Sequence, residues 1–507
     1  MRKFSFNDLF IYDMANNHQG DIAHGLNVIR AMGKVSKEAG VRGALKFQFR
    51  NIDTFIHPDY MNRKDVPHIP RFVNTRLSNE DYKILTNEVK KQGLTTICTP
   101  FDEESVDLIL KLDIEVVKVA SCSASDHPLL ERITEINRPV IVSTAGLALS
   151  QIDRLVSFLD YKSVNFALMH CVALYPTPED KLRLNRIDLL KNRFPDVAIG
   201  FSTHENPDNY SAIQIAYAKG ARLFERHIGL ETDKYKLNAY SSRPEQITSW
   251  IHAYFNAVET CGGEEYTPAF PEEKASLNSL KRGVFARRGI RRGEIIKREN
   301  VFFAMPFLEG QMASGEWSNG VLAKRHYAVN EPIEAGVVKL NISNDDIIYS
   351  IILQVKGMLN NARVFVGEES SIEISHHYGL ERFREFGAVI VDCMNRAYCK
   401  KLIIQLPRQK HPYHYHEKKE ETFQLLSGEL EVELDGTRTK LKPGDTFLIK
   451  PFQWHKFHTL GGAIFEEIST THYNDDSFYE DEQIARIPRE NRKTQITNWE
   501  AAIKEIL

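Results

Sequence analysis

The first 260 residues predict a (β/α)8 barrel, and two observations carry this prediction. Short apolar runs typical of buried parallel strands alternate with amphipathic helical stretches, and eight such runs occur before residue 230. The ends of these runs carry polar side chains, which is where barrel enzymes place their chemistry. The alternation alone is also compatible with an open, doubly wound sheet, so the strand ends decide in favour of the barrel.

The predicted strands cover residues 10–14, 44–49, 95–98, 116–120, 140–143, 166–170, 197–201 and 222–227. The amphipathic stretches between them predict helices over residues 22–38, 79–91, 102–111, 150–160 and 206–219. Residues 52–77 have no clear period and predict a loop over one face. Each predicted strand is thus separated from the next by enough chain for a crossover connection.

Composition indicates a soluble globular protein with several domains. The chain has 507 residues, 42% of them hydrophobic and 26% charged, with a formal net charge of -3. This balance favours neither nucleic acid nor a membrane as partner. The amino terminus does not have the pattern of a signal peptide, so we expect a cytoplasmic location. The six cysteines have no paired short spacing, which argues against a disulfide framework.

Polar residues follow strand after strand. They are Asp13, Lys46, Gln48, Thr99, Lys118, Ser121, Ser143, Tyr175, Ser202, His204 and His227. Neutral imidazoles at the ends of adjacent strands can share a metal ion, although one strand-end histidine alone is more often structural than a ligand. Two lysines directed at one barrel mouth indicate a bound dianion. The alternative is that both lysines extend to solvent, and the neighbouring hydroxyls favour the anion.

Several motifs together resemble the sialic acid synthase (N-acetylneuraminate synthase) family, from about residue 8 to about residue 340. The motifs are Asn17-His-Gln-Gly20, Leu45-Lys-Phe-Gln48, Thr99-Pro-Phe-Asp-Glu-Glu-Ser105, Val117-Lys-Val-Ala-Ser121, Val142-Ser-Thr-Ala-Gly146, Tyr175-Pro-Thr-Pro178, Gly200-Phe-Ser-Thr-His204 and Glu225-Arg-His227. The resemblance implies condensation of phosphoenolpyruvate with an aldose such as N-acetylmannosamine. The products would be phosphate and a 3-deoxy-2-keto (nonulosonic) sugar acid for surface glycans.

The resemblance also implies roles for the strand-end residues. The positions of His204 and His227 hold a metal, usually manganese, which can polarise the aldehyde oxygen. The phosphate and carboxylate of phosphoenolpyruvate would be bound by Lys46, Thr99, Lys118, Ser121, Ser143 and Ser202, with Tyr175 also on the substrate side. Asp13 stands where the family has a glutamate, and a proton-transfer or sugar-orienting role is expected. Gln48 is expected to position substrate.

Departures from the family pattern lie on the aldose side. Ala173 replaces a common asparagine, and Ser123 replaces an acidic residue. Residues 237–244 replace a segment that helps to hold the amino sugar, and Met305 stands where an arginine contacts the acyl group. We therefore expect the enol-donor half of the site to be kept and the aldose half to be remodelled, so that the acceptor is N-acetylmannosamine or a related sugar.

Residues 281–341 resemble the small antifreeze-like (SAF) domain that ends most members of this family. The signature begins at Arg282-Gly-Val-Phe-Ala-Arg-Arg-Gly-Ile-Arg-Arg-Gly and predicts a compact β-rich module. In the family this domain caps the barrel of the partner subunit. The resemblance therefore implies a domain-swapped homodimer.

The carboxyl-terminal region carries the two metal-binding motifs of a cupin barrel. Residues His414, His416, Glu421 and His455 have the spacing of a site with three histidines and one carboxylate, for which we expect manganese, zinc, iron or cobalt. Residues 360–475 resemble sugar isomerases of the D-lyxose isomerase type, and His458, Glu466 and Glu467 could face the same cavity. The cupin is either a second isomerase activity or a sugar-binding module.

These patterns divide the chain into three predicted domains: residues 1–265, 280–342 and 343–507, with the cupin core over 360–475. Two rivals to the synthase prediction stay open. In one, the barrel is non-catalytic and serves assembly. In the other, the whole activity is a sugar isomerase in the cupin.

Overall fold

A computed structural model describes residues 4–263, 267–318, 320–336, 344–367, 370–497 and 499. The chain forms two compact units, Met1–Thr267 and Pro268–Leu507. The predicted domain boundaries at residue 265 and at residues 342 and 343 lie outside the described residues.

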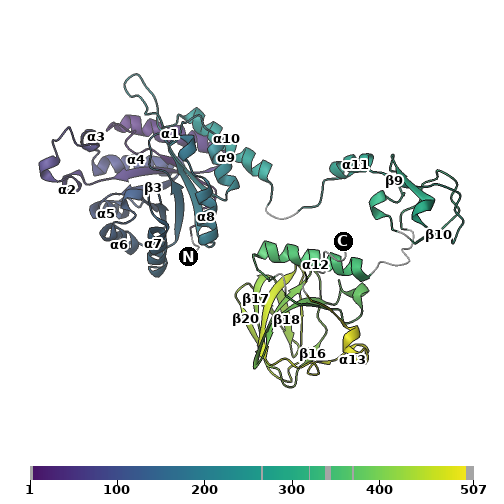
Figure 1. Ribbon diagram of the computed structural model, residues 1–507. Helices are drawn as coiled ribbons and strands as arrows, with labels where there is room; N and C mark the ends of the chain where they lie inside the picture. Colours follow the sequence, from purple (N-terminus) through teal and green to yellow (C-terminus); the bar gives the residue numbers. More distant parts are fainter. Residues whose placement is uncertain are drawn as a thin grey trace. The chain divides into compact units, whose positions relative to one another are not determined.

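The first unit consists of strands with helices around them (Figure 1). The strands form a closed barrel in which each strand pairs with the next and β8 pairs with β1, all in parallel. Its strands are β1 Leu9–Asp13, β2 Arg42–Phe49, β3 Thr95–Pro100, β4 Val116–Val119, β5 Val140–Ser143, β6 Phe166–Cys171, β7 Ala198–Thr203 and β8 Leu223–His227. Closure excludes the open doubly wound sheet. The predicted barrel is therefore confirmed.

Helices surround the barrel, and their apolar faces pack against the strands in one large core. They are α1 Ile22–Ala39, α4 Asn79–Lys91, α5 Glu103–Lys111, α6 His127–Glu135, α7 Leu149–Tyr161, α8 Asn185–Arg193, α9 Ser211–Ala218 and α10 Pro244–Cys261. The predicted loop over residues 52–77 is partly wrong, because it contains the short helices α2 Ile52–Phe55 and α3 Ile69–Asn74. Helices of four and six residues are too short to show a helical period.

The inside of the barrel changes from apolar to polar along the strands. Leu9 and Ile11 belong to an interior apolar cluster, and Asp13 follows them on the same face of β1. In the same way Leu223 precedes Glu225 on β8. The alternation of strand side chains thus places a polar layer at the carboxyl ends of the strands.

The second unit begins with α11 Pro271–Leu280 and a small β-rich module. Its strands are β9 Gly283–Ala286, β10 Ile295–Ile296, β11 Val301–Ala304 and β12 Val321–Leu322. β9 pairs with β11 and β10 with β12, both antiparallel, around an apolar cluster of their own. The β-rich prediction agrees with this module, and its antifreeze-like identity stays a prediction.

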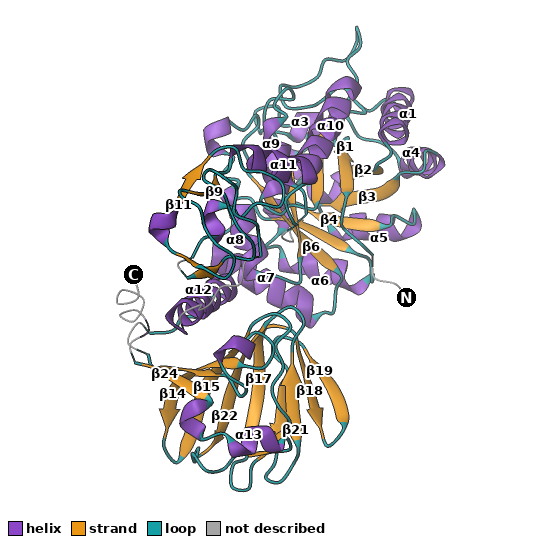
Figure 2. Cartoon of the chain, turned by 90° about the vertical axis from the view of Figure 1, so that its right-hand side faces the viewer, coloured by secondary structure: helices purple, strands orange, loops and turns teal. Residues whose placement is uncertain are grey.

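The rest of the second unit consists of two antiparallel sheets, with α12 Asn344–Ala362 packed on one of them (Figure 2). The seven-stranded sheet has the order β20-β17-β22-β15-β14-β13-β24, and the five-stranded sheet has the order β19-β18-β21-β16-β23. The strands are β13 Ile372–Ser375, β14 Ala388–Asn395, β15 Tyr398–Gln405, β16 His414–Tyr415, β17 Glu421–Gly428, β18 Leu430–Leu434, β19 Thr437–Leu441, β20 Thr446–Ile449, β21 His455–His458, β22 Ala463–Thr470, β23 Phe478–Tyr479 and β24 Lys493–Ile496, with helix α13 Glu482–Arg486 after β23. This all-β architecture agrees with the predicted cupin. Among the described residues, none of the helices is long and apolar enough to span a membrane.

Candidate active site and a second histidine cluster

Glu225 lies at the centre of a buried charge cluster inside the barrel. One carboxylate oxygen accepts hydrogen bonds from the Lys46 ammonium and the Ser202 hydroxyl, each at 2.9 Å. The other oxygen accepts from Lys118 at 2.8 Å. Lys46 also lies 3.0 Å from Asp13 Oδ2, and all five residues are buried. Ion pairs within the barrel therefore hold both lysines away from solvent.

The cluster balances two cations against two carboxylates. Burial alone would lower the pKa of Lys46, but Asp13 and Glu225 raise it above its usual value. Burial lowers the pKa of Lys118, which pairs with Glu225 at 2.8 Å. Glu225 is kept ionised by the two lysines, which hold its pKa below the usual range against the effect of burial. The lysines are thus positioned as paired cations at the carboxyl ends of β2 and β4.

The two strand-end histidines lie side by side, with ring centroids 5.2 Å apart. His204 Nδ1 donates to the carbonyl oxygen of Val172 at 3.0 Å, and His227 Nδ1 lies 3.3 Å from Asp13 Oδ2. Burial lowers the pKa of both imidazoles, so each is neutral near pH 7. With the proton on Nδ1, each Nε2 keeps a lone pair, as in histidines that bind metals. The pair therefore fits a divalent metal ion.

Two tyrosines flank the histidine pair. The ring of Tyr175 lies 4.2 Å from that of His204, and the ring of Tyr240 lies 5.2 Å from that of His227, measured between centroids. The two tyrosine rings are 5.3 Å apart. Tyr175 was predicted from the sequence. Tyr240 was missed, although it belongs to the segment 237–244 that departs from the family pattern.

Three of the predicted hydroxyl residues stand at the same end of the barrel without joining the charge cluster. Thr99 Oγ1 on β3 is buried and has no hydrogen-bond partner among the residues that the structure describes. The Ser121 hydroxyl accepts a hydrogen bond from the backbone of Ala145 at 3.0 Å, and Ser143 ends β5 in a buried position. Their role in binding substrate stays a prediction.

Gln48 and the missed residue Arg50 continue one face of the chain beyond Lys46. The Gln48 side-chain oxygen accepts from Arg50 at 3.1 Å. The Arg50 guanidinium lies 3.6 Å from the ring centroid of Phe101 and 4.1 Å from that of Phe72. Burial lowers the pKa of Arg50 to about 10. Spacing by two residues along a strand was the available signal for Arg50.

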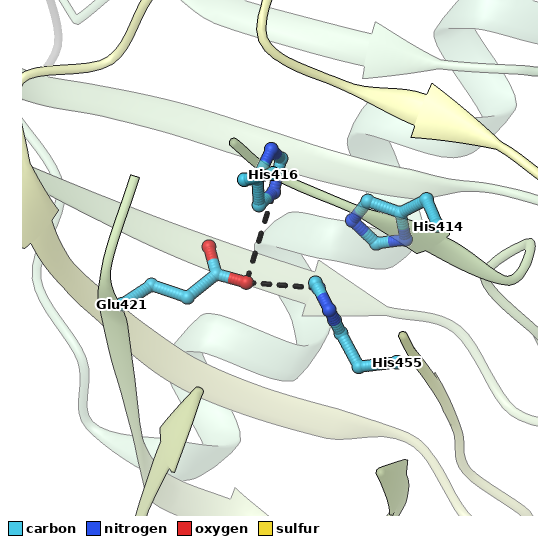
Figure 3. Close-up of side chains that lie close together, drawn as sticks. All are labelled: His414, His416, Glu421 and His455. Atoms are coloured by element: carbon cyan, nitrogen blue, oxygen red, sulfur yellow. Dashed lines mark ion pairs between the residues drawn. The ribbon is translucent and has the colours of Figure 1, made fainter. Parts of the chain in front are cut away.

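The four predicted cupin ligands converge between the two sheets (Figure 3). Their candidate ligand atoms all lie within 4.8 Å of one another, and all four residues are buried. Glu421 Oε1 lies 2.9 Å from His455 Nε2 and 3.8 Å from His416 Nε2. Over the described ranges, these three atoms are buried and have no hydrogen-bond partner. Buried polar atoms left without partners and facing one another fit a bound cation.

The Nδ1 atoms of the three cupin histidines point away from this centre. They contact the backbone carbonyl oxygens of Pro412, Asp476 and Gln453, from His414, His416 and His455 respectively. A carbonyl oxygen can only accept, so each Nδ1 carries the proton and each Nε2 keeps its lone pair. The cluster is therefore prepared for a metal of the kind that imidazole prefers.

Lys419 and Asp476 support this cluster and were not predicted. The Lys419 ammonium pairs with Glu421 Oε2 and, at 3.0 Å, with Glu467, which leaves Glu421 Oε1 facing the histidines. The Asp476 carboxylate accepts backbone hydrogen bonds from the loop that follows β16, between 2.9 and 3.1 Å.

Of the three further residues expected at the cupin cavity, only Glu467 lines it. His458 instead lies 3.8 Å from Glu431, and Glu466 pairs with Lys400 at 2.8 Å. Alternation along β22 explains the outcome for Glu466 and Glu467, because neighbouring residues of a strand face opposite sides.

The fold and the site define a barrel protein with a charged, histidine-containing centre at the carboxyl ends of its strands, followed by a cupin. Residues 32–266 match the NeuB family and residues 402–469 match the cupin domain. The chain belongs to the NeuB family, which confirms the resemblance predicted from its motifs.

Curated relatives and a solved structure are similar to between 57% and 67% of this chain. The N,N'-diacetyllegionaminic acid synthase of Campylobacter jejuni is 24% identical over 351 residues, which cover 67% of this chain and 98% of that enzyme. An uncharacterized protein of Methanocaldococcus jannaschii is 30% identical over 292 residues, 57% of this chain and 82% of that protein. The crystal structure of a putative spore coat polysaccharide biosynthesis protein E from Chromobacterium violaceum is 46% identical, with a TM-score of 0.63, and covers 66% of this chain and 99% of that chain.

Replacing Glu225 by glutamine tests the charge cluster. Glu225→Gln removes the carboxylate shared by Lys46 and Lys118, and breaking such a buried pair costs about 3–5 kcal/mol of unfolding free energy. Urea unfolding of the full chain measures the loss in the barrel transition. Glu259→Gln, at an exposed position of α10, is the matched control and should leave the transition unchanged. Equal stability of the two variants would contradict a central role for Glu225.

Proposed function

We propose that the barrel condenses phosphoenolpyruvate with an aldose to form a 3-deoxy-2-keto sugar acid and phosphate. The carrying observation is the juxtaposition of two buried lysines with two neutral histidines, whose Nδ1 atoms contact the Val172 carbonyl oxygen and the Asp13 carboxylate. Two findings support this reaction. The chain belongs to the NeuB family, and it is similar to an N,N'-diacetyllegionaminic acid synthase.

Lys46 and Lys118 would bind the phosphate and carboxylate of phosphoenolpyruvate. Ion pairing keeps Lys46 charged in the absence of substrate, and Glu225 fixes the position of both ammonium groups. Donors that are already oriented stabilise an anion without reorganisation during the reaction. The free hydroxyl of Thr99 offers a further donor, and the hydroxyls of Ser121, Ser143 and Ser202 complete the predicted set.

His204 and His227 would hold a divalent metal, for which manganese is the expected ion. The metal would act as a Lewis acid on the aldehyde oxygen of the acceptor. Asp13 acts as a positioning residue. Its Oδ2 contacts both His227 Nδ1 and the Lys46 ammonium, so one carboxylate fixes the imidazole tautomer and the lysine together. This role is narrower than the proton-transfer or sugar-orienting role expected from the sequence.

The reaction balances with water as the third reactant. A bond forms between C3 of phosphoenolpyruvate and the aldehyde carbon of the aldose, and the aldehyde oxygen takes up a proton. Water adds to C2, and the C2–O bond to phosphate breaks. Phosphate leaves with the former enol oxygen, and C2 becomes the ketone carbon of the sugar acid.

The acceptor differs from N-acetylmannosamine in this proposal. Met305 cannot donate a hydrogen bond to an acyl group, and Tyr240 brings an aromatic ring against the histidine pair. An aromatic ring packs against the C–H face of a sugar through dispersion. The aldose side of the site would therefore recognise its sugar more by ring stacking than by the amide contacts of the family.

The cupin is proposed to hold a second divalent metal at His414, His416, Glu421 and His455, as manganese, zinc, iron or cobalt. The convergence of four ligand atoms supports this site. An aldose–ketose isomerase activity there is the second candidate function, because a metal beside neighbouring sugar oxygens can polarise the carbonyl group.

The biological setting follows from the same proposal. A sugar acid of this class would be made in the cytoplasm as a precursor of surface glycans. The antifreeze-like module would cap the barrel of the partner subunit in a domain-swapped homodimer. The division into domains 1–265, 280–342 and 343–507 belongs to this proposal.

Phosphate release tests the synthase. The full chain with manganese and phosphoenolpyruvate should release phosphate only when a suitable aldose from a panel of aldoses and aldose phosphates is present. His227→Ala should lower this rate by at least about 100-fold, because the Lewis acid is lost. His252→Ala, at an exposed position of α10, is the matched control and should keep the rate. A folded chain that releases no phosphate with any aldose contradicts the proposal.

Metal content tests the cupin site separately. His416→Ala should remove one equivalent of metal per chain, measured by mass spectrometry after dialysis, and leave phosphate release intact. His458→Ala removes a histidine that lies outside the cluster and should retain the metal. Full metal content in the His416→Ala variant would rule out this ligand set.

A further inference from the structure

The cupin cavity extends beyond the four candidate ligands, and its wall is polar. Besides the histidines it is lined by the charged residues Lys401, Lys419, Lys493, Glu421 and Glu467 and by the hydroxyl residues Ser375, Ser477 and Tyr479. Hydroxyl and charged groups in this number suit a ligand with many oxygen atoms. The charges of the wall then decide which class of oxygen ligand fits.

Two of the three lysines are already paired at short distance. Lys419 pairs with Glu421 and Glu467, and Lys493 lies 2.7 Å from Glu373. Lys401 differs from both. It is only 6% exposed, yet its paired carboxylate oxygen, on the half-exposed Asp392, is 3.8 Å away, beyond hydrogen-bond distance. A buried ammonium without a close anion is costly, so a ligand anion beside Lys401 would be favourable.

Strand pairing directs Lys401 into this cavity. Lys401 on β15 is paired with Glu467 on β22, and Glu467 is paired with Phe423 on β17, so these side chains share one face of the sheet. The next residue, Lys400, lies on the opposite face, where it pairs with Glu466. Two lysines in sequence therefore stand in opposite environments.

A buried histidine lies on the same wall. His472 lines the cavity, and within the described part of the chain its buried Nε2 has no hydrogen-bond partner. Burial first, and then the nearby cations Lys401, Lys419 and Lys493, lower the pKa of His472. A neutral imidazole among cations offers a hydrogen bond to a ligand oxygen.

The metal proposed above adds two positive charges to this interior. Its ligands would be three neutral imidazoles and the Glu421 carboxylate. That carboxylate already offsets part of the positive charge of Lys419. In formal charge, Glu421, Glu467, Glu373 and the more distant Asp392 offset the three lysines and only part of the charge of the metal, so the loaded cavity would remain positive. An anionic ligand restores the balance.

We propose that the cupin cavity binds a sugar acid, with the carboxylate held by Lys401 and the hydroxyl groups facing the metal ligands. The proposal rests on the cupin metal site proposed above, and it does not depend on the barrel reaction. It makes the cupin ligand anionic, in contrast to the neutral sugars of an aldose–ketose isomerase. The product class proposed for the barrel is itself a sugar acid, so the two sites would share one ligand chemistry.

Titration calorimetry on the full chain loaded with manganese tests this inference, with D-glucuronate, D-glucose and D-glucose 6-phosphate as probes. D-glucuronate should bind at least 10-fold more tightly than D-glucose. Lys401→Met should remove this preference without changing the affinity for D-glucose or the metal content. Lys400→Met, the same substitution on the outer face, should leave all three affinities unchanged.

Each contrary result has its own meaning. Equal affinities for D-glucuronate and D-glucose at full metal content overturn the anion proposal, as does a preference that survives Lys401→Met or persists in the His416→Ala variant. Tighter binding of D-glucose 6-phosphate than of D-glucuronate overturns the choice of a carboxylate. If the His416→Ala variant loses no metal, this result contradicts the metal site instead. The metal content is measured before any sugar is added.

Discussion

The barrel depends on the ion pairing of Glu225 with Lys46 and Lys118. Two lysines inside a strand barrel would be strongly unfavourable alone, since an unpaired buried charge costs several kcal/mol. One carboxylate on β8 accepts from both, and Asp13 on β1 completes the balance. The cluster therefore holds two ammonium groups inside the protein core, which is the condition that the proposed binding of an anion requires.

Much of this arrangement was predictable from local pattern. Strand ends pointed to Lys46, Lys118, His204 and His227 because parallel strands of a barrel end on one face. Glu225 was missed as a site residue, although it stands two positions before His227 and therefore faces the same way. Its partners lie 179 and 107 residues away in sequence, so only the closed barrel reveals them.

The cupin shows the same division between spacing and context. His414 and His416 share a strand face, and the quartet could be assigned from motif spacing alone. Lys419 and Asp476 could not, because charged loop residues are ordinarily solvated and nothing local marks these two as buried. Likewise Glu466 and Glu467 are indistinguishable in sequence until the strand register decides which one faces inward.

The quartet draws its members from both cupin sheets. His414 and His455 lie on strands of the five-stranded sheet, whereas Glu421 begins a strand of the seven-stranded sheet. An ion at this point would cross-link the two sheets, which also pack against each other through apolar side chains. Folding of this region would then be coupled to metal binding. A lower concentration of free metal in the cell would leave more of the region unfolded and open to proteolysis.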